Sequence, residues 1–309
     1  MDVMKRLLVT GGSGFLGAEV VHVAGEAAAY VLATHHTRRK NASAALRSAA
    51  SQWLALDLRD PASVARVIEQ ARPDAVINTA YAATGDARIA LADGAFEIAT
   101  ATAARGIRLV HVSTDVVFDG ALASGSAYRE TDAAHPVHDY GRAKRDAELA
   151  IAAADPSAAI VRTSLLYTGD AFPRVPPSKH EQVVLDATNP AAPAQRGRYV
   201  FFTDEWRNPA QVTDVARALL EVAGFGAASD AARSLRGALH VAGADAVSRF
   251  EFAQCIAVAH RRDPARLIGE PSPSGGAPRP RNCTLDLSLA RSVLATPLRG
   301  VRTVLARAA

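Results

Sequence analysis

Short apolar runs alternate with amphipathic stretches along the first half of the chain. The runs are rich in β-branched residues and end at polar residues or glycine, which is typical of buried strands in a parallel sheet. They predict strands at 7–10, 30–34, 53–58, 74–81 and 107–114. The stretches that follow predict helices at 18–27, 61–70, 93–105 and 140–153, with Asp60 as a helix N-cap. This alternation predicts an α/β fold with a doubly wound parallel sheet.

The second half of the chain is less regular. Apolar segments predict strands at 159–166, 199–203 and 239–241, and helices at 212–223, 248–260 and 285–294. Thr213 is the expected N-cap of the first of these helices, and Ser248 with Glu251 forms a capping-box pattern at the second. Prolines dominate 168–198 and 271–281. We expect both to be irregular, with the first acting as a lid or a substrate-shaping insertion.

Composition excludes several classes of protein. The 309 residues are 49% hydrophobic and 21% charged, as in a soluble globular protein. The net charge of +4 is spread along the chain, and only 38–40 forms a dense basic cluster, so we expect no nucleic-acid partner. Cys255 and Cys283 form neither a disulfide framework nor a metal-binding pattern, which favours a reducing cytoplasm and no metal. The absence of a long apolar run predicts no membrane span.

The first predicted strand leads into a glycine-rich turn. Gly11, Gly14 and Gly17 are spaced by three residues, and an amphipathic run follows. Strand, tight turn and helix start together favour a dinucleotide, whose pyrophosphate lies at the helix N-terminus. The alternative is a turn that only joins strand to helix. The cofactor contacts expected here are Gly11, Ser13, Gly14, Phe15, Leu16 and Gly17.

Residues after the next strands specify the cofactor further. No Asp or Glu follows the strand at 30–34, where an NAD enzyme usually binds the ribose hydroxyls. Thr37 and Arg38 suit a 2′-phosphate instead, so NADP(H) is favoured over NAD(H), although a basic solvated loop would look the same. Further along, Asp57 and Leu58 are expected beside the adenine. Thr79, Ala80 and Tyr81 are expected at the carboxyl edge of the sheet, beside the cofactor.

Three side chains suit carbonyl reduction. Tyr140 and Lys144 are four residues apart, so one helix face carries both, and Thr114 ends the strand before that helix. A phenol can donate a proton to the developing alkoxide, an ammonium can lower the pKa of the phenol, and a hydroxyl can orient the carbonyl oxygen. Tyr-x-x-x-Lys alone is a weak signal. Together with the glycine turn it predicts a reductase.

Several motifs carry a family resemblance. TGGSGFLG, NTA, STDVVFDG, YGRAK and RTSLLY resemble an extended short-chain dehydrogenase/reductase. STDVVFDG with the downstream YRETD, FTDEWRNP and RPRNCTLD is similar to the dTDP-4-dehydrorhamnose reductase family, over nearly the whole chain. The resemblance implies NADPH-dependent reduction of a keto group on a nucleotide-linked deoxysugar. It also implies Thr114, Tyr140 and Lys144 as the catalytic set.

The resemblance also separates subclasses and suggests substrate contacts. Dehydratases of the superfamily carry Asp-Glu after the threonine, whereas Val116 follows Asp115 here, so dehydration is not expected. Leu91 occupies the position of a family Asn that holds a lysine–water relay, which implies an altered relay. His180 is expected to be a surface histidine rather than a base. The substrate-binding candidates are Asp115, Phe118, Arg207 and Arg279.

The expected organisation is two-lobed. Residues 1–167 would form the dinucleotide-binding domain, with 199–242 returning to it, while 168–198 and 243–309 would form a smaller substrate-binding lobe. The chain would act as a monomer or a homodimer. Two alternatives remain open. One is an epimerase or a reductase of another carbonyl that uses the same triad. The other is a non-catalytic NADP-binding subunit like the regulatory subunit of methionine adenosyltransferase, which resembles this same family.

Overall fold

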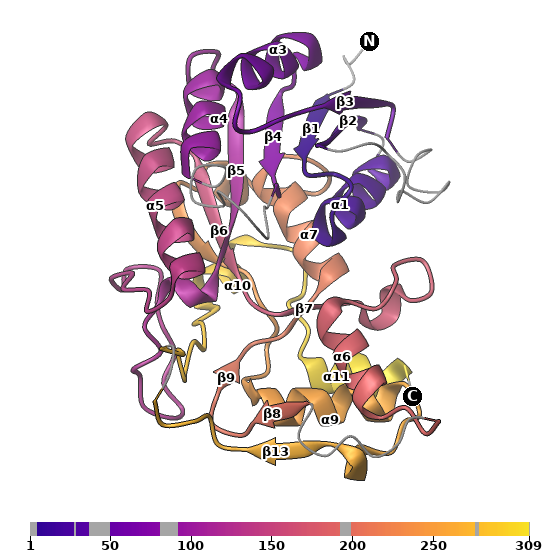
Figure 1. The fold of residues 1–309 in the computed structure, drawn as a ribbon. Helices are drawn as coiled ribbons and strands as arrows, with labels where there is room; N and C mark the ends of the chain where they lie inside the picture. The colour runs from indigo at the N-terminus through magenta and orange to yellow at the C-terminus, as the bar shows by residue number, and fades with distance from the viewer. Residues whose placement is uncertain are drawn as a thin grey trace.

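A computed structural model describes residues 5–27, 29–36, 50–80, 92–191, 199–275 and 278–308. Seven strands of these residues form one parallel sheet in the order β11-β6-β5-β4-β1-β2-β3 (Figure 1). The order reverses beside β1, which is where doubly wound sheets bind ligands. The strands are β1 (Arg6–Thr10), β2 (Tyr30–His35), β3 (Gln52–Ala55), β4 (Ala75–Asn78), β5 (Arg108–Thr114), β6 (Ala159–Thr163) and β11 (Gly237–His240).

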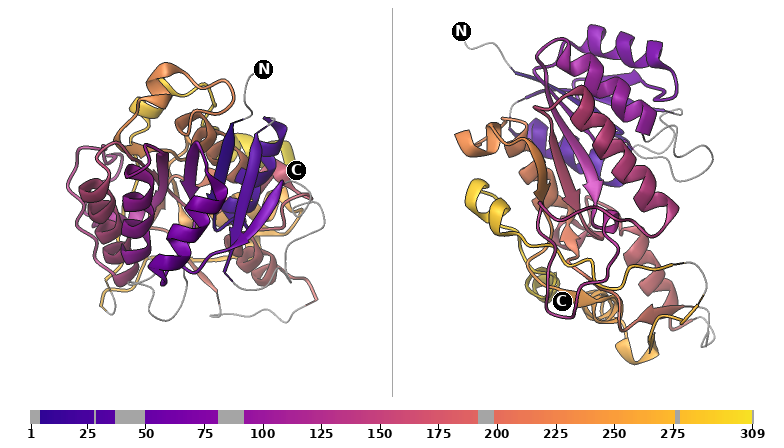
Figure 2. Two further views of the ribbon diagram at one scale, coloured as in Figure 1. Left: turned by 90° about the horizontal axis from the view of Figure 1, so that it is seen from above. Right: turned by 90° about the vertical axis from the view of Figure 1, so that its left-hand side faces the viewer.

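Helices cover both faces of the sheet. On one face α1 (Phe15–Glu26) packs against α7 (Val212–Val222), and their valines and leucines share a core with β1 and β6. On the other face α3 (Pro61–Ala71), α4 (Gly94–Ala103) and α5 (Asp139–Ala154) share a second core (Figure 2). The predicted doubly wound α/β fold is therefore confirmed.

Element ends differ from prediction by a few residues. The third strand ends at Ala55 rather than Leu58, and the fourth ends at Asn78, so Thr79 and Ala80 lie in the loop beyond it. Asp60 caps α3 as predicted, since its carboxylate accepts a hydrogen bond from the Ala62 amide. The expected strand at 159–166 divides into β6 and the short β7 (Leu166–Tyr167). It divides because the chain leaves the main sheet after Thr163 and pairs with β10 (Ala210–Gln211).

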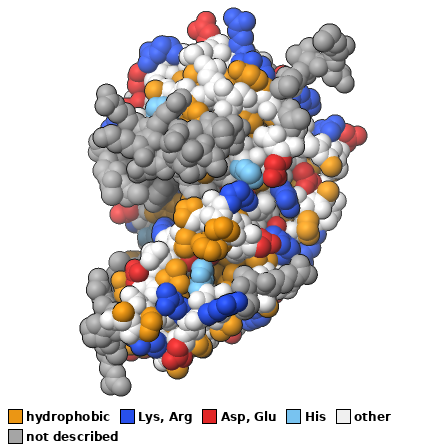
Figure 3. Space-filling view, turned by 90° about the vertical axis from the view of Figure 1, so that its right-hand side faces the viewer, with side chains coloured by type: hydrophobic (Ala, Val, Ile, Leu, Met, Phe, Trp, Pro, Cys, Tyr) orange, Lys and Arg blue, Asp and Glu red, His pale blue; other side chains and the backbone are white. Residues whose placement is uncertain are grey.

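The smaller lobe lies beyond the carboxyl edge of the sheet (Figure 1). Its helices are α6 (Lys179–Ala187), α9 (Arg249–Ala259) and α11 (Val301–Ala308), and a third core joins them. Short strands β8 (Val200–Phe202) and β13 (Ile268–Glu270) pair in parallel, while β9 (Trp206–Arg207) and β12 (Val247–Ser248) pair antiparallel. Charges of both signs are interspersed on the face shown in Figure 3, as on a solvated surface.

Three expectations for the second half of the chain were wrong. The segment at 168–198 is not wholly irregular, because α6 begins after Pro177 with a capping box formed by Ser178 and Glu181. The N-cap of α7 is Gln211 instead of Thr213, and its side chain accepts from the Asp214 amide. The last predicted helix shrinks to α10 (Ser288–Val293), and α11 follows it unpredicted. The capping box of α9 at Ser248 and Glu251 is confirmed.

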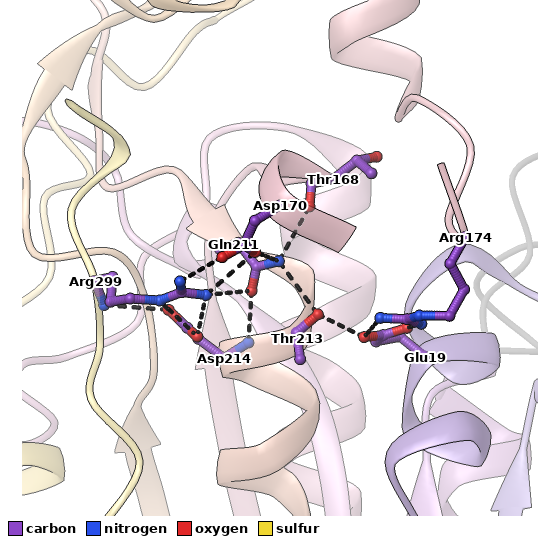
Figure 4. A network of polar contacts seen from close by, with 8 residues as sticks. All are labelled: Glu19, Thr168, Asp170, Arg174, Gln211, Thr213, Asp214 and Arg299. Atoms are coloured by element: carbon purple, nitrogen blue, oxygen red, sulfur yellow. Dashed lines mark hydrogen bonds and ion pairs between the residues drawn. The ribbon is translucent and has the colours of Figure 1, made fainter. Parts of the chain in front are cut away.

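A polar network ties the lobes together (Figure 4). Glu19 of α1 is fully buried, and its carboxylate accepts from Thr213 and pairs with Arg174, which precedes α6. On the other side of α7, Arg299 pairs with Asp214 at 2.8 Å and with Asp170 at 2.5 Å. A buried carboxylate needs such partners, so the network fixes α7 between the sheet and the lobe.

Every helix in the described ranges lacks either the length or the apolar character needed to cross a membrane. Within the same ranges, His, Cys, Asp and Glu side chains do not gather in threes that could hold a metal ion.

Candidate active site

A cleft of about 1340 Å³ separates the carboxyl edge of the sheet from the smaller lobe. Its two walls come from different parts of the chain. The sheet wall comprises the ends of β1, β2, β4, β5 and β6 with the first turns of α1 and α5. The lobe wall comprises Pro177, Ser178, Lys179, His180 and Arg249, from the starts of α6 and α9.

The glycine turn lines the sheet wall. Gly11 has φ of +69°, and a Cβ there would lie 2.7 Å from the Cα of Ala80. A Cβ on Gly17 would lie 2.2 Å from the carbonyl oxygen of Gly11. Both positions therefore require glycine, because the backbone of the turn lies against the first turn of α1 and against the loop that follows β4. Gly14 caps α1 without a side chain, and the first turn of α1 carries no acidic residue, so its amides suit an anion.

The predicted cofactor contacts that fall in described residues all line this cleft. These are Gly11, Ser13, Gly14, Phe15, Leu16, Gly17, Asp57, Leu58, Thr79, Ala80, Tyr140 and Lys144. Thr37, Arg38, Tyr81 and Leu91 lie outside the described residues.

Two further polar residues at this end of the cleft were missed by sequence reasoning. His36 follows β2 and Arg59 follows β3. The Asp57 carboxylate pairs with Arg59 at 2.8 Å and lies 3.4 Å from His36. Hydrogen bonds from Arg59 hold the pKa of Asp57 well below its usual range. No motif identified Arg59, although it lies only two residues beyond Asp57 and pairs with it.

The catalytic candidates lie where β5 and α5 meet. Lys144 is buried, and its Nζ donates to the Val112 carbonyl at 2.6 Å and lies 3.2 Å from His111 Nε2. Burial lowers the pKa of Lys144 to about 8, while the Glu148 carboxylate opposes the shift. Tyr140 is 38% exposed at the mouth of the cleft, one turn before Lys144. Thr114 ends β5 and lines the same wall.

Buried polar partners hold this wall in place. Glu148 accepts from Ser113 and pairs with Arg162 at 2.7 Å, so α5 is tied to β5 and β6. Thr163 is paired in register with Thr114 and also lines the cleft. The buried Thr163 hydroxyl has no partner among the described residues. Since buried hydroxyls are normally hydrogen-bonded, Thr163 is available to a ligand in the cleft.

Of the four substrate candidates, one lines the cleft. Asp115 lines the cleft. Burial raises the pKa of its carboxyl group, whereas Arg207 at 3.6 Å and a hydrogen bond from Ser164 act to lower it. Phe118 lies in the core, stacked on Tyr128. Arg207 is buried behind the wall and donates to the carbonyls of residues 280 and 281.

Arg279 pairs with the buried Glu205 at 2.5 Å and is not among the lining residues. The basic residues that do reach the cleft from the lobe are Lys179, His180 and Arg249. His180 was expected at the surface, whereas it is half-buried in the lobe wall. Burial, Arg249 and Lys179 lower the pKa of His180 to about 3, so it is neutral at physiological pH.

Comparison with known proteins agrees with this geometry. A family model described as "RmlD substrate binding domain" matches residues 4–309. The chain is 35% identical to dTDP-4-dehydrorhamnose reductase of Mycobacterium tuberculosis, over 98% of this chain and 92% of the relative. It is also 27% identical to the methionine adenosyltransferase 2 subunit beta of Xenopus laevis, over 92% of this chain and 81% of the relative.

Solved structures share the fold. The dTDP-4-dehydrorhamnose reductase of Bacillus anthracis in complex with NADP superposes with a TM-score of 0.76 at 22% identity, covering 99% of this chain and 98% of that one. A hypothetical dTDP-4-dehydrorhamnose reductase of Sulfolobus tokodaii has a TM-score of 0.73 at 26% identity, covering 95% and 96%. The chain therefore belongs to the RmlD substrate-binding domain family, the dTDP-4-dehydrorhamnose reductase-like branch of the extended short-chain dehydrogenase/reductases.

Proposed function

We propose that this protein is an NADPH-dependent reductase of a keto group on a nucleotide-linked deoxysugar. One observation carries the proposal. The glycine turn, Thr114, Tyr140 and Lys144 line one continuous cleft in a chain whose relatives are named as reductases of dTDP-linked 4-keto sugars. Dinucleotide, carbonyl and proton donor would meet in that cleft.

The chemistry follows the Tyr-x-x-x-Lys pattern. Bound NADPH supplies a hydride to the ketone carbon. The Tyr140 hydroxyl, at the mouth of the cleft, donates its proton to the oxygen that becomes negative. The Lys144 ammonium would stabilise the Tyr140 phenolate and would hold the nicotinamide ribose, while Thr114 would donate a hydrogen bond to the same substrate oxygen. Each side chain already lines the cleft, so little reorganisation is needed.

NADP fits the described end of the cleft. The free amides at the start of α1 would take the pyrophosphate, as helix N-termini do. Arg59 and His36 line the region beyond β2 and β3, and a guanidinium suits a 2′-phosphate. Thr37 and Arg38 would add to this site. Asp57 is occupied by Arg59 in an ion pair and is therefore a weaker acceptor for ribose hydroxyls than an unpaired carboxylate would be.

The sugar and its diphosphate would lie along the lobe wall. Lys179 and Arg249 give this wall positive charge, and His180 gives it a neutral ring. We assign 1–167 with 208–242 to the dinucleotide-binding domain, and 168–207 with 243–309 to the substrate lobe. The return to the first domain begins later than the expected residue 199, because β8 and β9 pair with β13 and β12 of the lobe. The pairing of β11 with β6 and the packing of α7 on α1 support the return of the chain to the first domain.

NADPH oxidation by the purified protein tests the function, with a panel of dTDP-linked 4-keto sugars as substrates. We expect turnover with at least one member of the panel. Tight NADPH binding without turnover on any of them would overturn the proposal. It would favour the second candidate, a non-catalytic NADP-binding subunit, which the likeness to the methionine adenosyltransferase 2 subunit beta supports.

A further inference from the structure

The buried side of Lys144 faces a chain of polar residues that the reaction does not use. Thr10, Asn78 and His111 lie side by side in register on β1, β4 and β5, and all three are buried. The Thr10 hydroxyl donates to Asn78 Oδ1 at 2.6 Å. Asn78 Nδ2 lies 2.9 Å from His111 Nδ1, and His111 Nε2 lies 3.2 Å from Lys144 Nζ. This series of polar side chains therefore connects the end of β1 to the Lys144 side chain.

Backbone geometry fixes the direction of these hydrogen bonds. The amide of Ala80 can only donate, and it lies 3.2 Å from Asn78 Oδ1. The side-chain oxygen of Asn78 must therefore face Ala80, and its nitrogen must face His111 Nδ1. That nitrogen can only donate, so His111 Nδ1 accepts. A neutral imidazole that accepts at Nδ1 carries its proton on Nε2.

We propose that His111 is a positioning residue that Asn78 holds in the Nε2–H tautomer, and that this N–H sets the position and protonation state of Lys144. An N–H that points at an ammonium repels it, whereas it donates a hydrogen bond to a neutral amine. The Lys144 amine keeps a second partner in either state, because it donates to the Val112 carbonyl. His111 thus favours release of a proton from Lys144 towards the cleft.

The surrounding charges are consistent with this role. Tyr140 and Glu148 flank Lys144 on α5, His111 faces it from β5, and Asp115 lines the same cleft. Arg162 of β6 pairs with Glu148 at 2.7 Å and offsets its charge. Burial and the nearby Lys144 hold the pKa of His111 well below its usual value, so the imidazole stays neutral.

The inference deepens the proposed function, since its consequence for reduction depends on Lys144 acting there. The His111 tautomer and the Lys144 pKa do not depend on the proposed function. A Lys144 that loses its proton readily can return one to the Tyr140 phenolate after hydride transfer. The proton then moves from Nζ to the phenolate oxygen, and solvent protonates the amine again.

Lysine NMR tests the inference directly, because the chain contains only Lys5, Lys40, Lys144 and Lys179. Protein labelled with ¹³Cε-lysine is titrated, and the Lys144→Met spectrum identifies the Lys144 signal. We expect Lys144 to titrate near pH 8, while ordinary lysines titrate at about 10.4. In His111→Gln the amide can turn its oxygen towards Nζ, so the Lys144 midpoint should rise by roughly 1 pH unit.

His240→Gln is the matched control. His240 is also fully buried in the sheet, on β11, and it does not line the cleft. Its replacement should leave the Lys144 midpoint unchanged. An unchanged midpoint in His111→Gln, or an equal rise in His240→Gln, would overturn the inference.

A second measurement holds even if His111→Gln fails to fold. The ¹⁵N shifts of His111 in the wild-type protein report which ring nitrogen carries the proton. We expect Nε2–H, and a proton on Nδ1 would overturn the inference. NADPH titration of the same samples separates the two proposals. A wild-type protein that does not bind NADPH would contradict the proposed function, while the His111 tautomer and the Lys144 midpoint would still decide the role of His111.

Discussion

The two walls of the cleft differ in how their polar side chains are held. On the sheet wall, Lys144 is buried, and its Nζ donates to the Val112 carbonyl and lies 3.2 Å from His111 Nε2. Strand register fixes His111 beside Asn78. On the lobe wall, by contrast, the ion pair between Arg249 and Glu205 is long, at 3.7 Å, and Lys179 is exposed. We expect the sheet wall, whose side chains are held more firmly, to hold the groups that carry out the reaction. The lobe wall, which is easier to change, would then choose the substrate.

The largest effect is expected from the sheet wall, at Tyr140. Tyr140→Phe removes the proton donor and keeps the ring, so kcat should fall by about 10³-fold with NADPH affinity retained. Turnover with the sugar substrate and NADPH fluorescence titration measure the two quantities. A kcat within a few-fold of wild type would show that the sheet wall does not supply the proton.

Gly17→Ala should come next in size. Its Cβ would lie 2.2 Å from the Gly11 carbonyl oxygen, so the turn must shift. The dissociation constant for NADPH should rise at least about 10-fold. Gly106→Ala is the control: Gly106 has a φ of +62°, so the substitution strains the backbone, but an added Cβ would meet no neighbouring atom. If both variants lose NADPH equally, general destabilisation rather than the turn is responsible.

Arg249→Gln probes the lobe wall. Loss of a charged contact to the substrate diphosphate should raise KM for the nucleotide sugar about 10-fold and leave NADPH affinity unchanged. Steady-state kinetics measure this, and Arg291→Gln on the exposed face of α10 serves as the control. An unchanged KM would remove Arg249 from the substrate site and weaken the distinction between the walls.

The smallest effect concerns the stability of the lobe wall. Burial alone would raise the pKa of Glu181. His260, whose Nε2 lies 3.9 Å from the carboxylate, and hydrogen bonds from the Thr168 and Ser178 amides outweigh burial and hold the pKa at about 2. This stabilisation is present above the ordinary value of 4.5 and is lost as the pH falls towards 2. Glu181→Gln should lower the free energy of unfolding by about 1–3 kcal/mol at neutral pH.

Urea unfolding at pH 7 and at pH 3 tests this pH dependence. The difference between wild type and Glu181→Gln should shrink at the lower pH. Asp186→Asn, an exposed carboxylate on the same helix, should show little difference at either pH. A difference that is the same at both values would contradict the role of the Glu181 charge.

The sequence predicted the sheet wall better than the lobe wall for a physical reason. Strand, glycine turn and helix are local patterns, so Gly11, Gly17 and the Tyr140–Lys144 pair could be identified from spacing. His111 could not, because strand register across the sheet brings it to Asn78. Arg59 pairs with the nearby Asp57, but no motif marks it. Ser178 and Glu181 form a readable capping box, but the surrounding prolines concealed α6. Arg249 reaches the cleft only through the packing of α9.

Hydride transfer tests the central claim most directly. NADPH labelled with deuterium at the transferred C4 position is incubated with a dTDP-linked 4-keto-6-deoxy sugar, and the product is examined by mass spectrometry and NMR. We predict one deuterium on the sugar carbon that carried the ketone, and labelling about 10³-fold slower when Tyr140→Phe replaces the wild type. Saturating NADPH binding with no deuterium in any sugar product would contradict the account.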